Sequence, residues 1–238
     1  MRGPYGFDMS DSCKNGKLSK FEFFHSLSQQ ALEDFDAIKS SSVYPEGAVL
    51  FLEKQEARGV FVLCDGEIKL TVSSSDGKTL ILRIAKPGEI LGLIAALSGE
   101  AYELTAETLR PCQVAFIRRE EFLKFVAKHQ EATQGVVKQL TANYHSACEQ
   151  FKTVGLSSSA PEKLARLLLR WSAGAVRTKL GTRITMPLTH QEIAEFIGSS
   201  RETVTRTLSD FRSRHLVTMK GSTLMIADRP ALQACAND

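Results

Sequence analysis

Apolar positions along the chain follow two periods, and the changes between them divide the sequence into segments. From Phe21 to Ile38 apolar side chains recur near the three- and four-residue spacing of an α-helix. From Val43 to Ile117 they gather in short β-rich runs between turns. Helical spacing then returns over one long stretch, Arg119–Gly155. The pattern therefore predicts a helix, a β-domain and a long helix, in that order.

The β-rich segment contains short strands separated by glycine turns. Gly66, Gly77, Gly88 and Gly99 recur every 11 residues, and strands at such spacing are typical of a small antiparallel sandwich or roll. Glycine in the Asp-Gly pairs supplies the positive φ that tight hairpins need. The predicted strands are Val49–Leu52, Val60–Cys64, Ile68–Val72, Leu80–Ile84 and Gln113–Ile117.

The second half of the long helix carries a heptad pattern. Its apolar residues alternate in steps of three and four, the spacing of a coiled-coil seam, over roughly two and a half repeats. Such a seam favours pairing with a second copy of the chain; the alternative is a helix packed against its own domain. The seam residues are Val137, Leu140, Tyr144, Ala147, Phe151 and Val154.

The C-terminal part is expected to begin with a hinge and to contain two hairpins. The serines and the proline of residues 156–161 predict a break, because serine side chains compete for backbone hydrogen bonds and proline suits the first turn of a new helix. That helix is expected over Glu162–Trp171, followed by a small hairpin near Gly181 that ends at Ile184–Met186. The final hairpin is expected from Leu216–Met219 and Thr223–Ile226.

Two short helices joined by a turn are predicted between these hairpins. Thr189 can cap the first helix, and Glu192 three residues later completes a capping box. Gly198 ends this helix, because glycine adopts the left-handed conformation without a Cβ penalty. Ser199 with Glu202 predicts a second capping box, so another helix begins at once.

The second helix of this pair has two different faces. Val204, Leu208 and Phe211 form an apolar side, whereas charged and hydroxyl residues occupy the other. Arginine can hydrogen-bond guanine O6 and N7 together, and glutamate can accept from cytosine N4. The alternative is a helical hairpin with a solvated face, but the order of residues favours a helix-turn-helix that reads DNA. The candidate DNA contacts are Thr189, Ser199, Ser200, Arg201, Glu202, Thr203, Thr205, Arg206 and Lys220, the last at the tip of the final hairpin.

The run from Ser200 to Arg206 resembles the recognition helix of the Crp–Fnr superfamily of bacterial transcription regulators, in its catabolite-activator branch. The resemblance extends over nearly the whole chain. It implies an α+β fold with an N-terminal antiparallel β-roll like a cyclic-nucleotide-binding domain, a long dimerisation helix and a C-terminal winged helix-turn-helix. The boundaries expected are 1–20 for a flexible arm, 21–118 for the β-roll sensor, 119–156 for the dimerisation helix and 157–238 for the DNA-binding domain.

The function implied by the resemblance is that of a homodimeric regulator of transcription. Two recognition helices related by a two-fold axis would bind an inverted repeat with TGTGA-like half-sites. An effector of unknown identity in the β-roll would control the dimer, and RNA polymerase would be a partner of an activator. The alternative is a sensor module that regulates a protein partner without binding DNA.

The resemblance also implies a cyclic-nucleotide pocket in two halves. The run 88–92, Gly-Glu-Ile-Leu-Gly, matches a turn that offers N–H groups to a phosphate and a carboxylate to a ribose; alternatively its glycines only shape a turn. The second half, an Arg-Ser pair, would fall at Tyr102 and Glu103, where arginine is missing and a like charge is added. We therefore expect no tight binding of cAMP unless Arg83 or Lys86 reaches the phosphate. The candidate pocket residues are Arg83, Gly88, Glu89, Gly92, Tyr102, Glu103 and Thr105.

No metal site or cofactor is predicted. An iron–sulfur cluster usually needs four thiolates, but Cys13 stands alone near the N-terminus, and Gly16 occupies the place of a CxxC partner. Cys13 with His25 would supply only two ligands for a metal ion. A single histidine can be an axial ligand of heme, which leaves heme open at His25, His129 or His145.

Composition and charge narrow the function classes further. Residues 157–238 hold 12 of the 30 Lys/Arg and 7 of the 27 Asp/Glu, a net charge of +5, and the remaining residues have a net charge of −2. A basic C-terminal part suits a nucleic-acid partner. No catalytic motif is present, which argues against an enzyme. Without an 18-residue apolar run or a secretory signal, we expect no membrane partner and a cytoplasmic protein. Reduced thiols are expected at Cys13, Cys64, Cys112, Cys148 and Cys235.

Overall fold

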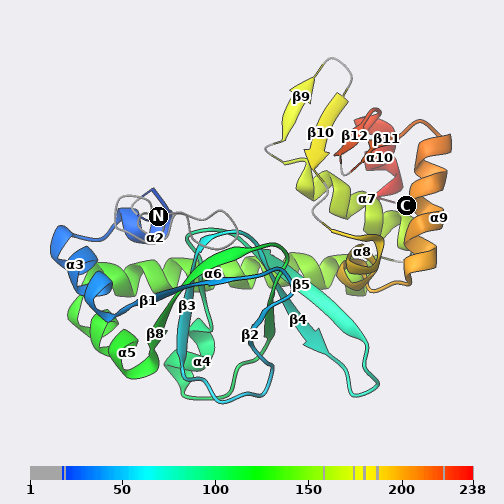
Figure 1. Cartoon of the computed structure of the whole chain (residues 1–238). Helices are drawn as coiled ribbons and strands as arrows, with labels where there is room; N and C mark the ends of the chain where they lie inside the picture. The colour runs from blue at the N-terminus through cyan, green and yellow to red at the C-terminus, as the bar shows by residue number, and fades with distance from the viewer. Residues whose placement is uncertain are drawn as a thin grey trace. The chain divides into compact units, whose positions relative to one another are not determined.

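A computed structural model gives the fold of the chain (Figure 1). It describes residue 18 and residues 20–157, 159–173, 175–178, 181–185, 188–221 and 223–237. The expected arm, residues 1–20, lies outside the described residues except for Leu18 and Lys20. The chain divides into two units: the first runs to Val72 and includes Leu82–Ser146, and the second consists of Ser73–Ile81 and Ala147–Asp238.

Two antiparallel sheets form the β-roll. The first sheet has the order β1-β8-β3-β6 and the second the order β2-β7-β4-β5. All five predicted strands are confirmed within a residue or two, whereas β1, β6 and β7 were not predicted. The strands are β1 (Ser40–Tyr44), β2 (Val49–Phe51), β3 (Gly59–Asp65), β4 (Ile68–Ser73), β5 (Thr79–Ala85), β6 (Ile90–Leu91), β7 (Thr105–Thr108) and β8 (Cys112–Arg118).

Strand β3 explains why the roll has two cores. Successive side chains of a strand point to opposite faces of the sheet. Val60 and Val62 therefore pack in a cluster with helical residues, whereas Phe61 and Leu63 pack between the two sheets. Both faces of this strand are buried, which is why its sequence is a continuous apolar run.

The helices of the first unit cover one face of the β1-β8-β3-β6 sheet. The expected helix over Phe21–Ile38 is in fact two helices, because Ser28 caps a new helix by accepting from the Ala31 N–H. The expected helix over Arg119–Gly155 is also divided: it is broken at His129, whose backbone is extended, and its last residues form a π-helix. The elements are α2 (Glu22–His25), α3 (Gln29–Ile38), α4 (Leu93–Ser98), α5 (Arg119–Lys128) and α6 (Gln130–Phe151), whose residues from Ala147 onward belong to the second unit together with η2 (Lys152–Leu156).

The break at His129 brings its side chain to a carboxylate. His129 Nε2 lies 2.8 Å from Asp34 Oδ2, which also accepts from Lys128 Nζ at 2.5 Å. A third donor, Gln30 Nε2, lies 3.1 Å from Asp34 Oδ1. Hydrogen bonds from Lys128 first, and then from His129 and Gln30, lower the pKa of Asp34 to about 2.

This pKa predicts a specific acid sensitivity. Because the pKa of Asp34 is lower in the folded chain than its ordinary value of 3.8, ionised Asp34 stabilises the fold above about pH 4, and this contribution is lost as pH falls towards 2. We expect Asp34→Asn to lower the melting temperature at neutral pH and to flatten its decline between about pH 4 and 2. Thermal unfolding across that range, with Asp36→Asn on the same helix as the control, tests this; equal pH profiles for Asp34→Asn and the native chain would contradict it.

The second unit contains the helix pair and a third sheet, of order β11-β12-β10-β9. The predicted final hairpin is confirmed, and so is the helix after the hinge, where Ser159 accepts from the Glu162 N–H and Pro161 lies in the first turn. Ser158 of the hinge and Met186 of the small hairpin lie outside the described residues. The elements are α7 (Ala160–Trp171), β9 (Val176–Thr178), β10 (Gly181–Thr185), α8 (His190–Ile197), α9 (Arg201–Ser213), β11 (Val217–Lys220), β12 (Thr223–Ile226) and α10 (Arg229–Cys235).

The cysteines differ in state. Cys112, Cys148 and Cys235 are free thiols. Burial raises the pKa of the Cys112 thiol to about 11. Cys64 is disulfide-bonded, so the expectation of a reduced thiol is wrong at this position. Cys13 lies outside the described residues.

Candidate functional site

The predicted helix-turn-helix consists of α8, a tight turn and α9. The capping box at the start of α8 is confirmed: Thr189 Oγ1 accepts from the Glu192 N–H, and the Glu192 carboxylate accepts from the Thr189 N–H at 2.9 Å. Gly198 ends α8 with a φ of 62°, and the N–H groups of Gly198 and Ser199 both donate to Ala194 O. The turn is therefore set by local sequence.

The cap of α9 lies one residue later than predicted. Ser200, not Ser199, is the cap, and its Oγ accepts from the Thr203 N–H at 3.2 Å. The physical reason is that Ser199 is already used to close α8. Ser200 is therefore the first residue that is free to cap α9.

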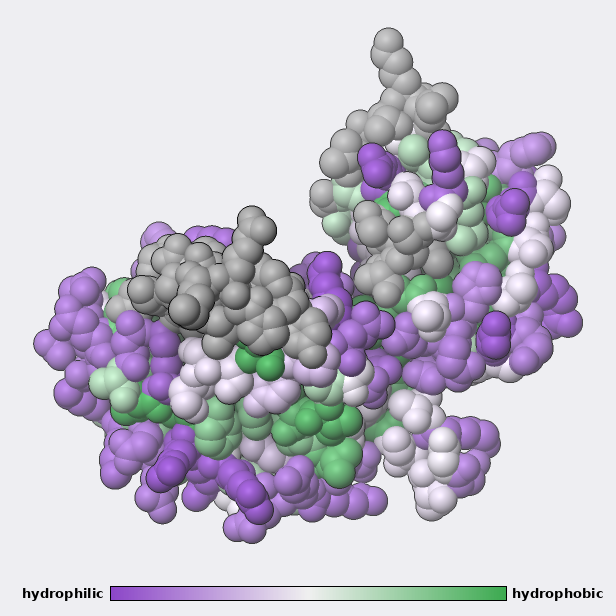
Figure 2. All heavy atoms as spheres, viewed as in Figure 1, coloured by the Kyte–Doolittle hydropathy of each residue, from purple (hydrophilic) through white to green (hydrophobic). Residues whose placement is uncertain are grey.

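The two faces of α9 lie as predicted. Val204, Leu208 and Phe211 are buried, and Thr207 is buried with them, its hydroxyl donating to Thr203 O at 2.8 Å. The opposite face is exposed, and Figure 2 shows largely hydrophilic side chains over α9. The exposed residues of its first two turns are Arg201, Glu202, Thr205 and Arg206.

The charges on this face are available to a ligand. Among the residues that the structure describes, neither Arg201 nor Arg206 forms an ion pair. The pKa of Glu202 is lowered, mainly by a hydrogen bond from its own backbone N–H and then by the Ser200 hydroxyl. The face therefore presents an anionic acceptor between two forked cationic donors, which is what base edges of a G·C-containing site require.

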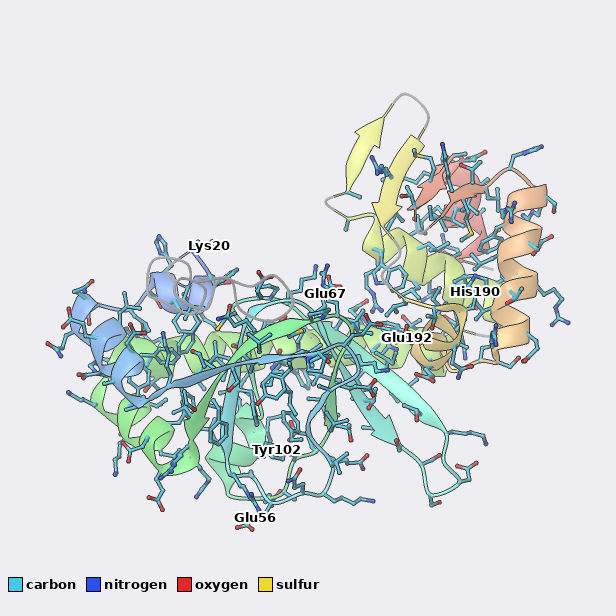
Figure 3. All side chains as sticks on the ribbon, in the orientation of Figure 1. Lys20, Glu56, Glu67, Tyr102, His190 and Glu192 are labelled. Carbon is cyan, nitrogen blue, oxygen red and sulfur yellow. The ribbon has the colours of Figure 1, made fainter. Side chains whose placement is uncertain are left out.

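One contact that orders the helix pair was missed by the sequence analysis. His190 Nδ1 lies 2.9 Å from Thr205 Oγ1, and the Thr205 hydroxyl donates to Arg201 O at 2.9 Å (Figure 3). Since the single hydroxyl proton is used on Arg201 O, His190 Nδ1 must be the donor in this bond. The contact joins residues 15 positions apart, so no helical spacing could have revealed it. It fixes the start of α8 against the second turn of α9.

A second missed residue anchors α8 to the end of α6. Gln150 is 1% exposed, and its Nε2 donates to Phe196 O at 2.5 Å and to Ile81 O at 3.1 Å. Its Oε1 accepts from Arg170 at 3.1 Å, and the Arg170 guanidinium lies over the ring of Phe196. A polar residue inside a heptad pattern gave no signal of this role. The amide ties α6, α8 and β5 together within the second unit.

The remaining predicted contact lies in the final hairpin. Lys220 is the last residue of β11 and is exposed. The hairpin β11–β12 follows α9, and its strand β12 pairs with β10. An exposed lysine at such a tip can touch a phosphate.

Comparison with known proteins matches both halves of this architecture. A model of the cyclic nucleotide-binding domain matches residues 42–129, and a model of the Crp-like helix-turn-helix domain matches residues 162–235. The chain belongs to the Crp–Fnr superfamily of bacterial transcription regulators. It is a DNA-binding regulator of transcription and not an enzyme.

Individual relatives of this Crp–Fnr chain are distant. It is 27% identical over 205 residues to the transcriptional activatory protein AadR of Rhodopseudomonas palustris, covering 86% of this chain and 84% of that protein. It is 23% identical over 190 residues to a CRP-like cAMP-activated global transcriptional regulator of Mycobacterium tuberculosis, covering 79% of this chain and 84% of that protein. A solved CRP-family regulator from Thermus thermophilus has 25% identity and a TM-score of 0.68, covering 83% of this chain and 97% of that one.

The structure separates the candidate effector residues of this Crp–Fnr chain into two groups. Arg83, Gly88 and Glu89 line one cavity of about 370 Å³ in the first unit. The Arg83 guanidinium is ion-paired with the Glu89 carboxylate. The Glu89 carboxylate is therefore already paired with Arg83, a residue of β5.

The second group lies elsewhere in the roll and does not line this cavity. Tyr102 is 3% exposed; its ring stacks on Phe51 at 4.1 Å and its hydroxyl donates to Gly59 O at 2.7 Å (Figure 3). Burial is the main cause that raises the pKa of Tyr102. Gly92 lies against this ring, Glu103 is exposed, and Thr105 Oγ1 accepts from the Glu53 N–H. These residues pack the roll interior and its rim.

Three of the predicted seam residues are large and exposed. Val137, Tyr144 and Phe151 are 57%, 68% and 71% exposed, and they follow one another at seven-residue intervals on α6. Ala147 is also exposed, and Val154 in η2 is half-buried. Leu140 instead packs against the cluster beneath the β1-β8-β3-β6 sheet. The exposed face of α6 is therefore narrower than the predicted seam.

The candidate heme ligands and other metal sites give no cluster. His25 and His145 are exposed, and His129 is buried beside Asp34. In the described ranges no group of three or more His, Cys, Asp or Glu could hold a metal ion. No described helix is both long and apolar enough to span a membrane.

Proposed function

We propose that the chain acts as a homodimer that binds an inverted-repeat operator with TGTGA-like half-sites. The observation that carries the proposal is the exposed start of α9, where Arg201 and Arg206 flank the ionised Glu202. Arg201 and Arg206 would contact guanines and Glu202 a cytosine. A regulator of this kind works on the chromosome, in the cytoplasm.

The exposed face of α6 supports the dimer. Large apolar side chains at seven-residue spacing on a helix are costly in water and are typical of a coiled-coil seam. Pairing two α6 helices about a two-fold axis would bury Val137, Tyr144 and Phe151 of both protomers. The same axis would relate the two recognition helices, so that the operator is an inverted repeat with half-sites about 10–10.5 base pairs apart, centre to centre.

Allosteric control would pass through the end of α6. The chain continues from α6 into the π-helix η2 and then, through the hinge, into α7, and π-helical turns are frequent at functional sites. Gln150 fastens α8 to this end of α6. An effector in the β-roll that shifts the α6 pair would therefore shift the recognition helices. If the regulator is an activator, RNA polymerase would be its partner.

Fluorescence anisotropy with labelled duplexes tests the proposal. The probes are an inverted repeat of TGTGA half-sites, a single half-site and a scrambled duplex at the same salt concentration, because phosphate contacts alone give salt-dependent binding to any DNA. We expect the inverted repeat to bind at least about 10³-fold more tightly than the scrambled duplex. Equal affinity for the repeat and the scrambled duplex would instead favour a sensor module that acts on a protein partner.

cAMP is not the effector in this proposal. Glu103 stands where an anionic phosphate would need arginine, and the stacked rings of Phe51 and Tyr102 occupy space between the sheets of the roll. Calorimetry with cAMP is expected to show no saturable heat at micromolar concentrations. A dissociation constant below about 1 μM, equivalent to about −8.2 kcal/mol, would overturn this expectation.

A further inference from the structure

A cavity in the first unit lies between one face of α6, the turn after β5 and the aromatic residues that begin α2. Its volume is about 370 Å³, within the range of roughly 300–1,000 Å³ typical of small-molecule sites. The face of α6 that lines it lies opposite the exposed seam. This cavity face consists of Gly135, Lys138, Gln139, Ala142, Asn143 and Ser146.

Two glycines shape the aromatic wall of the cavity. A Cβ at Gly135 would lie 2.7 Å from the ring of Phe23, so glycine lets α6 approach that ring. Gly88 has a φ of 94°, and a Cβ there would lie 2.4 Å from the ring of Phe21. Both rings line the cavity. They provide the flat apolar contact that an aromatic group requires.

The charges that line the cavity favour an anion. Arg83 and Glu89 neutralise each other, and the Lys86 N–H donates to Glu89 Oε1 at 2.8 Å. The side chains of Lys86 and Lys138 have no ion-pair partner among the described residues. Glu22 is the one carboxylate in the described lining besides Glu89. Two unpaired cations against one carboxylate leave a net positive lining.

Neutral donors lie on the same wall. Gln139 is engaged, since its amide donates to Ile90 O at 2.7 Å and accepts from the Ile90 N–H at 3.1 Å. Asn143 and Ser146, one and two turns further along α6, have no hydrogen bond from their side chains within the described ranges. They can donate to an oxygen of a ligand whose ring rests on Phe21 or Phe23.

We propose that this cavity binds a small aryl anion, a carboxylate or a phosphate monoester on a ring, with the ring against Phe21 and Phe23 and the anionic group between Lys86 and Lys138. The site is separate from Tyr102 and the space between the sheets. Its regulatory role rests on the proposed function, because a ligand there would contact the back of the helix that forms the dimer seam. The binding itself does not depend on DNA.

Titration of the DNA-free chain tests the site. The probes are 1-naphthoate and 1-naphthyl phosphate, with 1-naphthylmethylamine as a cation of similar shape. Binding of each probe is measured by calorimetry and by changes in the amide chemical shifts of the chain. We expect at least one anion to saturate at one molecule per chain, with shifts at Gly135, Ala142 and Ser146. Preference for one anion tells a carboxylate ligand from a phosphate ester. No saturable binding of either anion at about 1 mM would overturn the proposal.

Paired charge reversals separate this site from nonspecific binding. Lys86→Glu with Lys138→Glu is expected to weaken binding of the anion at least tenfold and to favour the amine. The matched control is Lys54→Glu with Lys124→Glu, whose side chains are 87% and 71% exposed and do not line the cavity. Ala142→Phe, which fills the cavity without changing charge, should also abolish binding. The proposal would be contradicted if the control pair lost as much affinity for the anion, or if the Lys86 and Lys138 pair bound the anion as tightly as the native chain. If the chain bound the anion but failed the operator assay, only DNA recognition would be contradicted.

Discussion

A chain carrying Tyr144→Glu and Phe151→Glu is expected to be a monomer and to lose high-affinity binding to the inverted repeat. Burying a large apolar side chain contributes about 1.5–3 kcal/mol, and the two changes remove four such side chains from a symmetric pair. The new carboxylates would also face one another across the axis. We expect the dimer dissociation constant to rise by at least about 10³-fold. Sedimentation equilibrium measures it directly.

His145→Glu is the matched control for this prediction. It adds a carboxylate to an exposed position of the same helix, outside the seam. Because Tyr144 and Phe151 are exposed in the single chain, their replacement should leave the melting temperature of the monomer nearly unchanged. If the double variant remained a dimer with native affinity for the repeat, the seam would lie elsewhere.

Arg206→Ala is expected to change which DNA sequence is bound, not only how tightly. A bidentate contact with guanine accounts for about 1–3 kcal/mol of discrimination, so the change should cost roughly 5- to 150-fold at one base pair of each half-site. Preference at the other positions should remain, because Arg201 and Glu202 are untouched. Affinities for operators substituted singly at each position give the required profile.

Arg212→Ala provides the contrast on the same helix. Arg212 is exposed but lies near the C-terminal end of α9, far from the turns expected to reach base edges. Its loss should weaken all sequences alike, if at all, and reduce the salt dependence of binding. Uniform weakening by Arg206→Ala would show that its guanidinium contacts phosphate.

Local signals in the sequence were sufficient for much of this architecture. Thr189, Glu192 and Gly198 determine α8 and its turn through bonds to residues within five positions, so the pattern alone predicted them. The strand β3 could likewise be predicted from its own sequence, because both of its faces are buried and its residues form a continuous apolar run. The predicted cap of α9, Ser199, was one residue too early, because the end of α8 and the start of α9 share the same short turn.

Long-range contacts explain what the sequence could not predict. His129 interrupts the expected long helix to reach Asp34, which lies 95 positions away. Gln150 bonds carbonyls of Ile81 and Phe196, and neither contact has a spacing signal. Long-range contacts also explain why the candidate effector residues do not form one pocket. The family resemblance placed Tyr102 beside Glu89, but the structure buries Tyr102 against Phe51.

Selection of bound sites from random duplex DNA shows directly which sequence and which symmetry the chain recognises. The native chain and Arg206→Ala would be compared without added nucleotide. The native chain is expected to enrich an inverted repeat with TGTGA-like half-sites about 10–10.5 base pairs apart, and Arg206→Ala is expected to lose preference at one symmetric pair of positions. Enrichment of no sequence, or of a single asymmetric site unchanged by Arg206→Ala, would contradict it.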